Sequence, residues 1–62
     1  MTRKNEVFEL KDVEFKHETS KALLIVYDDE EYWIPLSQVE EIHRAEGRIV
    51  MSAWIAKQKG FL

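Results

Sequence analysis

An aromatic segment that ends in the only proline of the chain places the strongest constraint on the fold. Residues 32–36 read Tyr-Trp-Ile-Pro-Leu, and Ser37 and Gln38 follow. Proline lacks an N–H group and therefore belongs at a strand end or a sheet edge, while Ser37 favours a turn. The pattern predicts a strand that ends here and a single 3₁₀-like turn over residues 36–39, where the chain changes direction.

The residues before this segment predict a β-hairpin. Residues 21–27 form an apolar run without alternation, which is typical of a central strand covered on both faces. A tight acidic turn follows, formed by Asp28, Asp29, Glu30 and Glu31. The chain then returns with Tyr32 and Ile34 on one face and Trp33 on the other. Two strands joined in this way are a hairpin.

The N-terminal apolar residues change parity along the chain. Phe8 and Leu10 share one parity, whereas Val13 and Phe15 share the other. A strand of period two cannot place both pairs on one face without an extra residue between them. We therefore expect a bulge or sharp bend near residues 11–12, although two separate short strands would produce the same pattern. A bulge of this kind lets a strand coil around a small barrel.

The segment after the proline predicts two further strands. Residues 39–44 hold two apolar side chains among charged ones, which fits either a short strand or a helical turn, and we prefer the strand. Gly47 is free to adopt positive φ and marks the next turn. Residues 48–51 then form a last short strand.

The last residues predict a short helix over residues 53–59. Ser52 is a suitable N-cap, and Gly60 suits the position after the helix end. A helix this short is not stable alone in water, so its apolar side chains must pack on the sheet. We expect this of Met51, Trp54, Ile55 and Phe61.

These patterns predict a mainly β protein of the α+β type. We expect a small antiparallel, strongly bent sheet or an SH3-like or OB-like barrel of about five strands, with one short C-terminal helix. The 62 residues suffice for one domain, over residues 7–62, preceded by a polar and flexible N-terminus over residues 1–6.

Composition limits the cellular compartment in which the protein is expected and the means by which it can be stabilised. The chain has no cysteine, so neither a disulfide nor a thiolate metal site adds stability. It has no apolar run of membrane-spanning length and no apolar leader. We therefore expect a cytoplasmic protein without a membrane partner.

No catalytic pattern is present in the sequence. Ser20, Ser37 and Ser52 lack the flanking glycines of a nucleophile elbow. His17 and His43 stand in polar segments without a second histidine at helical spacing. We expect no enzyme, no metal and no cofactor, and we assign the two histidines to the surface.

The surplus of aromatic side chains predicts a binding surface. Seven aromatic residues are too many for so small a core to bury completely, and tryptophan is enriched at interfaces. The expected protein-binding residues are Trp33, Tyr32, Asp28, Asp29, Glu30 and Glu31.

Two alternatives stay open. The first is binding of single-stranded nucleic acid by stacking on aromatic side chains, with the basic residues Lys11, Lys16, Lys21, Arg44 and Arg48. The net charge of −3 disfavours this, because affinity for a phosphate backbone rests on positive charge. The second is a self-associating structural protein, a homodimer for instance, since open strand edges are often completed by another copy.

A spaced motif resembles small uncharacterised proteins encoded by bacteriophages and prophages. It comprises Lys-Ala-Leu-Leu at 21–24, Tyr-Trp-Ile-Pro-Leu-Ser-Gln-Val at 32–39, Ile-Val at 49–50, Trp-Ile-Ala at 54–56 and Lys-Gly at 59–60. Those proteins carry a similar W-I-P-x-S-Q block and end in a similar helix, and the likeness covers roughly residues 21–62. Leu36 stands where that block would have a lysine. The resemblance implies the host bacterial cytoplasm, and with it we expect a non-enzymatic module that modulates or inhibits a host or phage protein.

Overall fold

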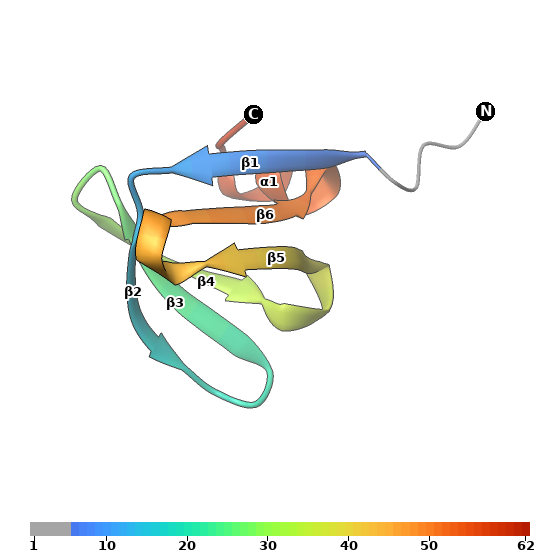
Figure 1. Cartoon of the computed structure of the whole chain (residues 1–62). Coiled ribbons are helices and arrows are strands. Elements are labelled where there is room, and N and C mark those ends of the chain that lie inside the picture. Colours follow the sequence, from blue (N-terminus) through green and yellow to red (C-terminus); the bar gives the residue numbers. More distant parts are fainter. Residues whose placement is uncertain (1–5) are drawn as a thin grey trace.

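The computed structural model describes residues 6–62, which form six strands, two 3₁₀ turns and one α-helix (Figure 1). The strands are β1 (Val7–Lys11), β2 (Glu14–Glu18), β3 (Ala22–Tyr27), β4 (Glu30–Pro35), β5 (Val39–His43) and β6 (Arg48–Ser52). The 3₁₀ turns are η1 (Leu36–Gln38) and η2 (Arg44–Glu46), and the helix is α1 (Ala53–Lys59). The expected flexible N-terminus lies, apart from Glu6, outside the described residues.

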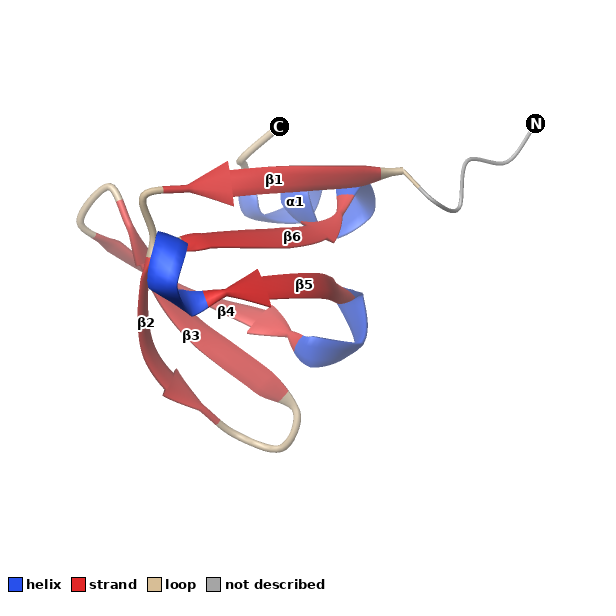
Figure 2. Cartoon of the chain, in the orientation of Figure 1, coloured by secondary structure: helices blue, strands red, loops and turns tan. Residues whose placement is uncertain are grey.

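The strands form two three-stranded antiparallel sheets, ordered β1-β6-β5 and β2-β3-β4 (Figure 2). The expected antiparallel, mainly β fold with one short C-terminal helix is confirmed. The barrel form is wrong for residues 6–62, because β4 and β5 are joined through η1 and are not paired in one sheet. Each sheet therefore keeps two open edges.

Asp12 is the residue at which the chain passes from one sheet to the other. Its φ of 61° lies in the left-handed region, which takes the backbone out of the extended path. Leu10 and Val13, which have opposite parity, are consequently both buried. The Val13 N–H group donates to the Gly47 carbonyl oxygen at 2.9 Å. The expected bend is confirmed, and it divides one long strand into β1 and β2, so the expected number of about five strands becomes six.

The hairpin between β3 and β4 turns through two residues. Asp28 and Asp29 have φ values of 55° and 65°, and Tyr27 pairs with Glu30 on either side of them. Positive φ at both central positions is the geometry of a type I′ turn, whose twist matches that of the flanking strands. Aspartate tolerates this region better than most residues. The hairpin prediction is confirmed, but the turn is shorter than expected, because Glu30 and Glu31 already pair with β3 as the first residues of β4.

The proline segment also follows the prediction. Pro35 ends β4, and η1 begins at the next residue. The Leu36 N–H group still donates to the Lys21 carbonyl oxygen at 2.8 Å. Residues 39–43 then form β5, which confirms the strand preferred for this segment, and Arg44 begins η2.

A single apolar core lies between the sheets and α1. It consists of Leu10, Val13, Leu23, Ile25, Ile34, Ile49, Met51, Ile55 and Ala56. No described residue of polar or charged type is buried, so desolvation of polar side chains costs this core nothing.

The expectation that β3 is covered on both faces is wrong. Leu23 and Ile25 are fully buried, whereas Leu24 and Val26 on the opposite face are half-buried. β3 is central within its sheet, as expected. Its outer side is only half-buried because α1 packs on β1 and β6 (Figure 1).

Helix α1 begins and ends where the sequence predicts. The Ser52 hydroxyl accepts a hydrogen bond from the Ile55 N–H group at 3.3 Å, and Gly60 has a φ of 87°. Ile55 and Ala56 face the core. Trp54 does not pack on the sheet as expected but is 59% exposed, because the helix rotates about 100° between neighbouring residues and Ile55 takes the inward direction.

Phe61 closes one end of the core after the helix. Its N–H group donates to the Ala56 carbonyl oxygen at 2.8 Å, which folds the chain back. Its ring lies 4.7 Å from the Tyr32 ring, 5.7 Å from the Tyr27 ring and 6.5 Å from the Phe8 ring, measured between centroids. Side chains of β1, β3 and β4 therefore meet on this one residue.

Candidate interaction surfaces

The outer face of the β2-β3-β4 sheet carries an apolar surface, which we call the tryptophan face. It consists of Ala22, Leu24, Val26, Trp33 and Pro35. In the register, His17 faces Leu24, which in turn faces Trp33. The His17 and Trp33 rings meet edge to face over Leu24, with centroids 6.3 Å apart. Trp33 still has 44% of its surface exposed, so a large aromatic side chain is available for contact.

An ion pair borders the tryptophan face. β2 has a register shift between Phe15 and His17, which displaces Lys16 from the regular ladder. The Lys16 Nζ atom lies 3.1 Å from a Glu31 carboxylate oxygen, so the pair spans β3 from one edge of the sheet to the other. Both side chains are more than half exposed, and water therefore screens their attraction.

The β3–β4 hairpin carries four acidic residues, two in its turn and two at the start of β4, of which Glu31 lies on the tryptophan face and Glu30 on the opposite face. Asp28, Asp29, Glu30 and Glu31 are all exposed. Glu31 pairs with Lys16, and the Glu30 carboxylate accepts a hydrogen bond from the Tyr32 hydroxyl at 3.1 Å. The tip therefore presents a local excess of negative charge at the end of the hairpin, and Glu31 is the acidic residue on the same face as Trp33.

Tyr32 and Trp33, which the sequence assigns to one site, lie on opposite faces of β4. Tyr32 packs against Phe61 at the end of the core, whereas Trp33 faces outward. Desolvation, followed by the hydrogen bond to Glu30, raises the pKa of the Tyr32 phenol above its ordinary value of 10.0. Of the four acidic residues, the structure thus places only Glu31 on the same face as Trp33, and it leaves the Tyr32 ring on the core side.

The outer face of the β1-β6-β5 sheet, which we call the charged face, is of a different kind. It consists of Val7, Glu9, Lys11, Glu41, His43, Arg48 and Val50, with Glu46 of η2 at its end. Arg48 donates to Glu9 at 2.6 Å and to Glu46 at 2.5 Å, and the His43 Nε2 atom lies 2.7 Å from Glu41. The hydrogen bond from Arg48 lowers the pKa of Glu46.

The basic residues considered for nucleic-acid binding do not gather on one surface. Lys11 and Arg48 are partners on the charged face, whereas Lys16 borders the tryptophan face. Arg44 pairs with Glu18 at 2.6 Å and lies over the Phe15 ring at 5.5 Å. Lys21 precedes β3. Three of the five cations are thus engaged by carboxylates of the chain itself, which reduces the positive charge available to a phosphate backbone.

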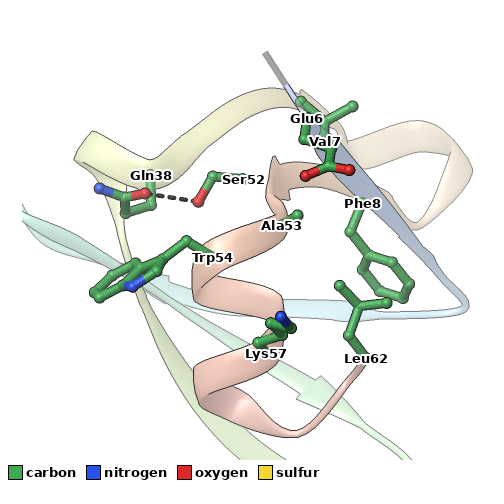
Figure 3. A pocket seen from close by; sticks show the side chains of 9 residues that line it. All are labelled: Glu6, Val7, Phe8, Gln38, Ser52, Ala53, Trp54, Lys57 and Leu62. Atoms are coloured by element: carbon green, nitrogen blue, oxygen red, sulfur yellow. Dashed lines mark hydrogen bonds between the residues drawn. The ribbon is translucent and has the colours of Figure 1, made fainter. Parts of the chain in front are cut away.

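A groove of about 580 Å³ lies beside α1 (Figure 3). Its lining comprises Glu6, Val7, Phe8, Gln38, Ser52, Ala53, Trp54, Lys57 and Leu62. A hydrogen bond of 2.6 Å between Ser52 and Gln38 connects its two sides. Sequence reasoning missed this groove, because it placed Trp54 on the sheet. One sequence signal could have indicated it: Trp54 and Ile55 are neighbours in a short helix, so both cannot point toward the core.

Residues 6–62 offer no cluster of three histidine or carboxylate side chains that could hold a metal ion. His17 belongs to β2 and His43 to β5, in different sheets. Ser52 caps the helix and Ser37 lies in η1. The described part of the chain also contains no helix with the length and apolar character needed to cross a membrane.

Comparisons of the chain with protein-family models, with curated proteins and with solved structures give no match. The likeness to bacteriophage proteins stays a prediction from the sequence motif. Function is accordingly inferred from the surfaces described above.

Proposed function

We propose that this chain is a non-enzymatic protein-binding module whose tryptophan face docks on a protein partner. One observation carries the proposal: Trp33 is 44% exposed on an apolar sheet face, whereas α1 packs on β1 and β6 of the other sheet. Exposed apolar patches next to polar residues mark interaction sites on small proteins. Tryptophan is also among the residues that contribute most to interface energies.

The acidic tip defines the chemistry of the partner. Asp28 and Asp29 project at the end of the tryptophan face, and the chain as a whole has a net charge of −3. Electrostatic complementarity accelerates association and excludes partners of like charge. The partner is therefore a protein with an apolar patch flanked by basic side chains. The phage resemblance supports a host or phage protein in the bacterial cytoplasm, whose activity the module modulates or inhibits.

The test is an affinity pull-down from bacterial lysate, followed by calorimetry with the purified partner. We expect Trp33→Ala to weaken the affinity about thirtyfold or more, because truncation of a central tryptophan costs about 2 kcal/mol or more. Trp54→Ala is the matched control, since Trp54 is also exposed but lies outside the tryptophan face. Equal affinities of the two variants would disprove this role of Trp33.

Neutralisation of the tip is a second test. Asp28→Asn combined with Asp29→Asn removes both charges and keeps a residue type that tolerates the positive φ of this turn. It should slow association and reduce its salt dependence, because attraction between separated charges is screened by salt. Size-exclusion chromatography with light scattering, without and with single-stranded DNA, examines the two alternatives. A salt-sensitive shift with DNA would favour nucleic-acid binding, and a concentration-independent dimer would place the tryptophan face at a subunit interface.

A further inference from the structure

We infer that the partner binds as an extended segment that adds a strand to the open edge of β4. The inference rests on the proposed function and specifies how the tryptophan face is recognised. β4 is an edge strand, since its sheet is ordered β2-β3-β4. Addition of a strand to such an edge is a common mode of peptide recognition, in which backbone hydrogen bonds supply much of the affinity.

The phase of the β3–β4 ladder identifies the free backbone groups. Leu36 donates to the Lys21 carbonyl oxygen, so these two residues form a hydrogen-bonded pair. Such pairs alternate along an antiparallel ladder, and Tyr32 and Ile34 therefore direct their backbone groups toward β3. Glu31 and Trp33 direct theirs toward the open edge. The residues with free backbone groups are thus those whose side chains lie on the outer face.

The other three edges are less suited to an added strand. β2 has a bulge at Lys16, and β5 has a register shift between Val39 and Glu41. Bulges twist an edge and protect it from pairing. β1 is regular, but it carries charges of both signs, Glu9 and Lys11, so it offers no single charge for a partner to match. β4 combines a regular register with an exposed tryptophan and charges of one sign.

The side chains of β4 specify the sequence of the added segment. Glu31 and Trp33 stand two residues apart on the same face, and a paired strand places its own alternate side chains beside them. A basic residue fits beside Glu31 and an apolar or aromatic residue beside Trp33. The segment therefore contains a basic residue and an apolar residue separated by one position. Pro35 has no N–H group to donate, which limits the pairing toward η1.

Amide hydrogen exchange measured by NMR tests this mode of binding. The probe is a synthetic peptide of about eight residues, the length of an ordinary strand, in which lysine and valine alternate with threonine between them. In the free protein, the amides of Glu31 and Trp33 should exchange fast and those of Tyr32 and Ile34 slowly. Saturation with the peptide should protect Glu31 and Trp33. Failure of the peptide to bind at millimolar concentration, or binding without this protection, would overturn the inference.

Two comparisons sharpen the test. N-methylation of the peptide amides of one parity should abolish binding, whereas methylation of the other parity should leave it intact, because only one set faces β4. Glu31→Lys should weaken the lysine peptide about fivefold through cross-strand repulsion, while Glu40→Lys, an equal charge change in β5, should not. Equal effects within either comparison would contradict strand addition. The pull-down with Trp33→Ala does not use this peptide, so it tests the proposed function separately.

Discussion

The charged face and the tryptophan face are the outer faces of two three-stranded sheets, yet one carries mainly paired charges and the other mainly apolar side chains. On the charged face, Arg48 bridges Glu9 and Glu46, so the polar groups find partners within the chain. On the tryptophan face, the rings of His17 and Trp33 cover Leu24 only partly. On the charged face only Val7 and Val50 are apolar, whereas most of the tryptophan face is apolar and gains more from burial. This difference is the reason for proposing the tryptophan face as the interaction surface.

The largest expected effect comes from a comparison of two neighbouring leucines of β3. Leu23 is fully buried and Leu24 half-buried on the tryptophan face. Leu23→Ala should destabilise the fold by about 2–5 kcal/mol, as cavity formation in a core does, and should leave so small a domain largely unfolded. Leu24→Ala should lower the urea midpoint much less. Similar losses for both variants would show that the outer side of β3 belongs to the core.

The second test compares the two faces in salt. Arg48→Ala removes two ion pairs on the charged face, so it should lower the urea midpoint at low salt and have a smaller effect at high salt, where such pairs are screened. Trp33→Ala should lower the free energy of unfolding by roughly 0.5–1 kcal/mol, and salt should not alter this loss. Salt-independent destabilisation by Arg48→Ala would mean that Arg48 acts through packing of its aliphatic stem.

The third test is acidification. The Arg48 hydrogen bond holds the pKa of Glu46 below its ordinary value of 4.5, so the bond stabilises the fold above this pH. The contribution is lost as the pH falls through the lower, folded-state pKa. Urea titrations at stepped pH should therefore show that the wild-type protein loses more stability on acidification than Glu46→Gln does. Parallel curves would contradict the assignment.

The smallest expected effect concerns Tyr32 in alkali. Its pKa is raised by desolvation and by the hydrogen bond to Glu30. The neutral phenol therefore contributes its full stabilisation at pH values below the ordinary pKa of 10.0. This contribution is lost as the pH rises through the folded-state pKa. Tyr32→Phe should be less sensitive than the wild-type protein over this alkaline range. The ultraviolet absorbance of the phenolate follows the titration of Tyr32 when it is recorded on Tyr27→Phe, since the chain has two tyrosines.

Short-range signals in the sequence predicted several elements of the fold correctly. The helix limits follow from Ser52 and Gly60, because capping depends on the few residues around each terminus. The hairpin follows from the adjacent aspartates, and the end of β4 from Pro35. The bend at Asp12 follows from the parity of the apolar residues on either side of it.

The tertiary structure decided which surfaces remain open. Trp33 and Trp54 are both aromatic residues beside apolar neighbours, and the sequence predicted a binding surface at Trp33 but packing on the sheet for Trp54. Their exposure depends on where α1 packs, which is set by contacts with β1 and β6. The bond between Arg48 and Glu9 likewise joins residues 39 positions apart. Local chemistry fixes turns and caps, but strand pairing over such separations determines which faces are covered, and that pairing arises only when the whole core assembles.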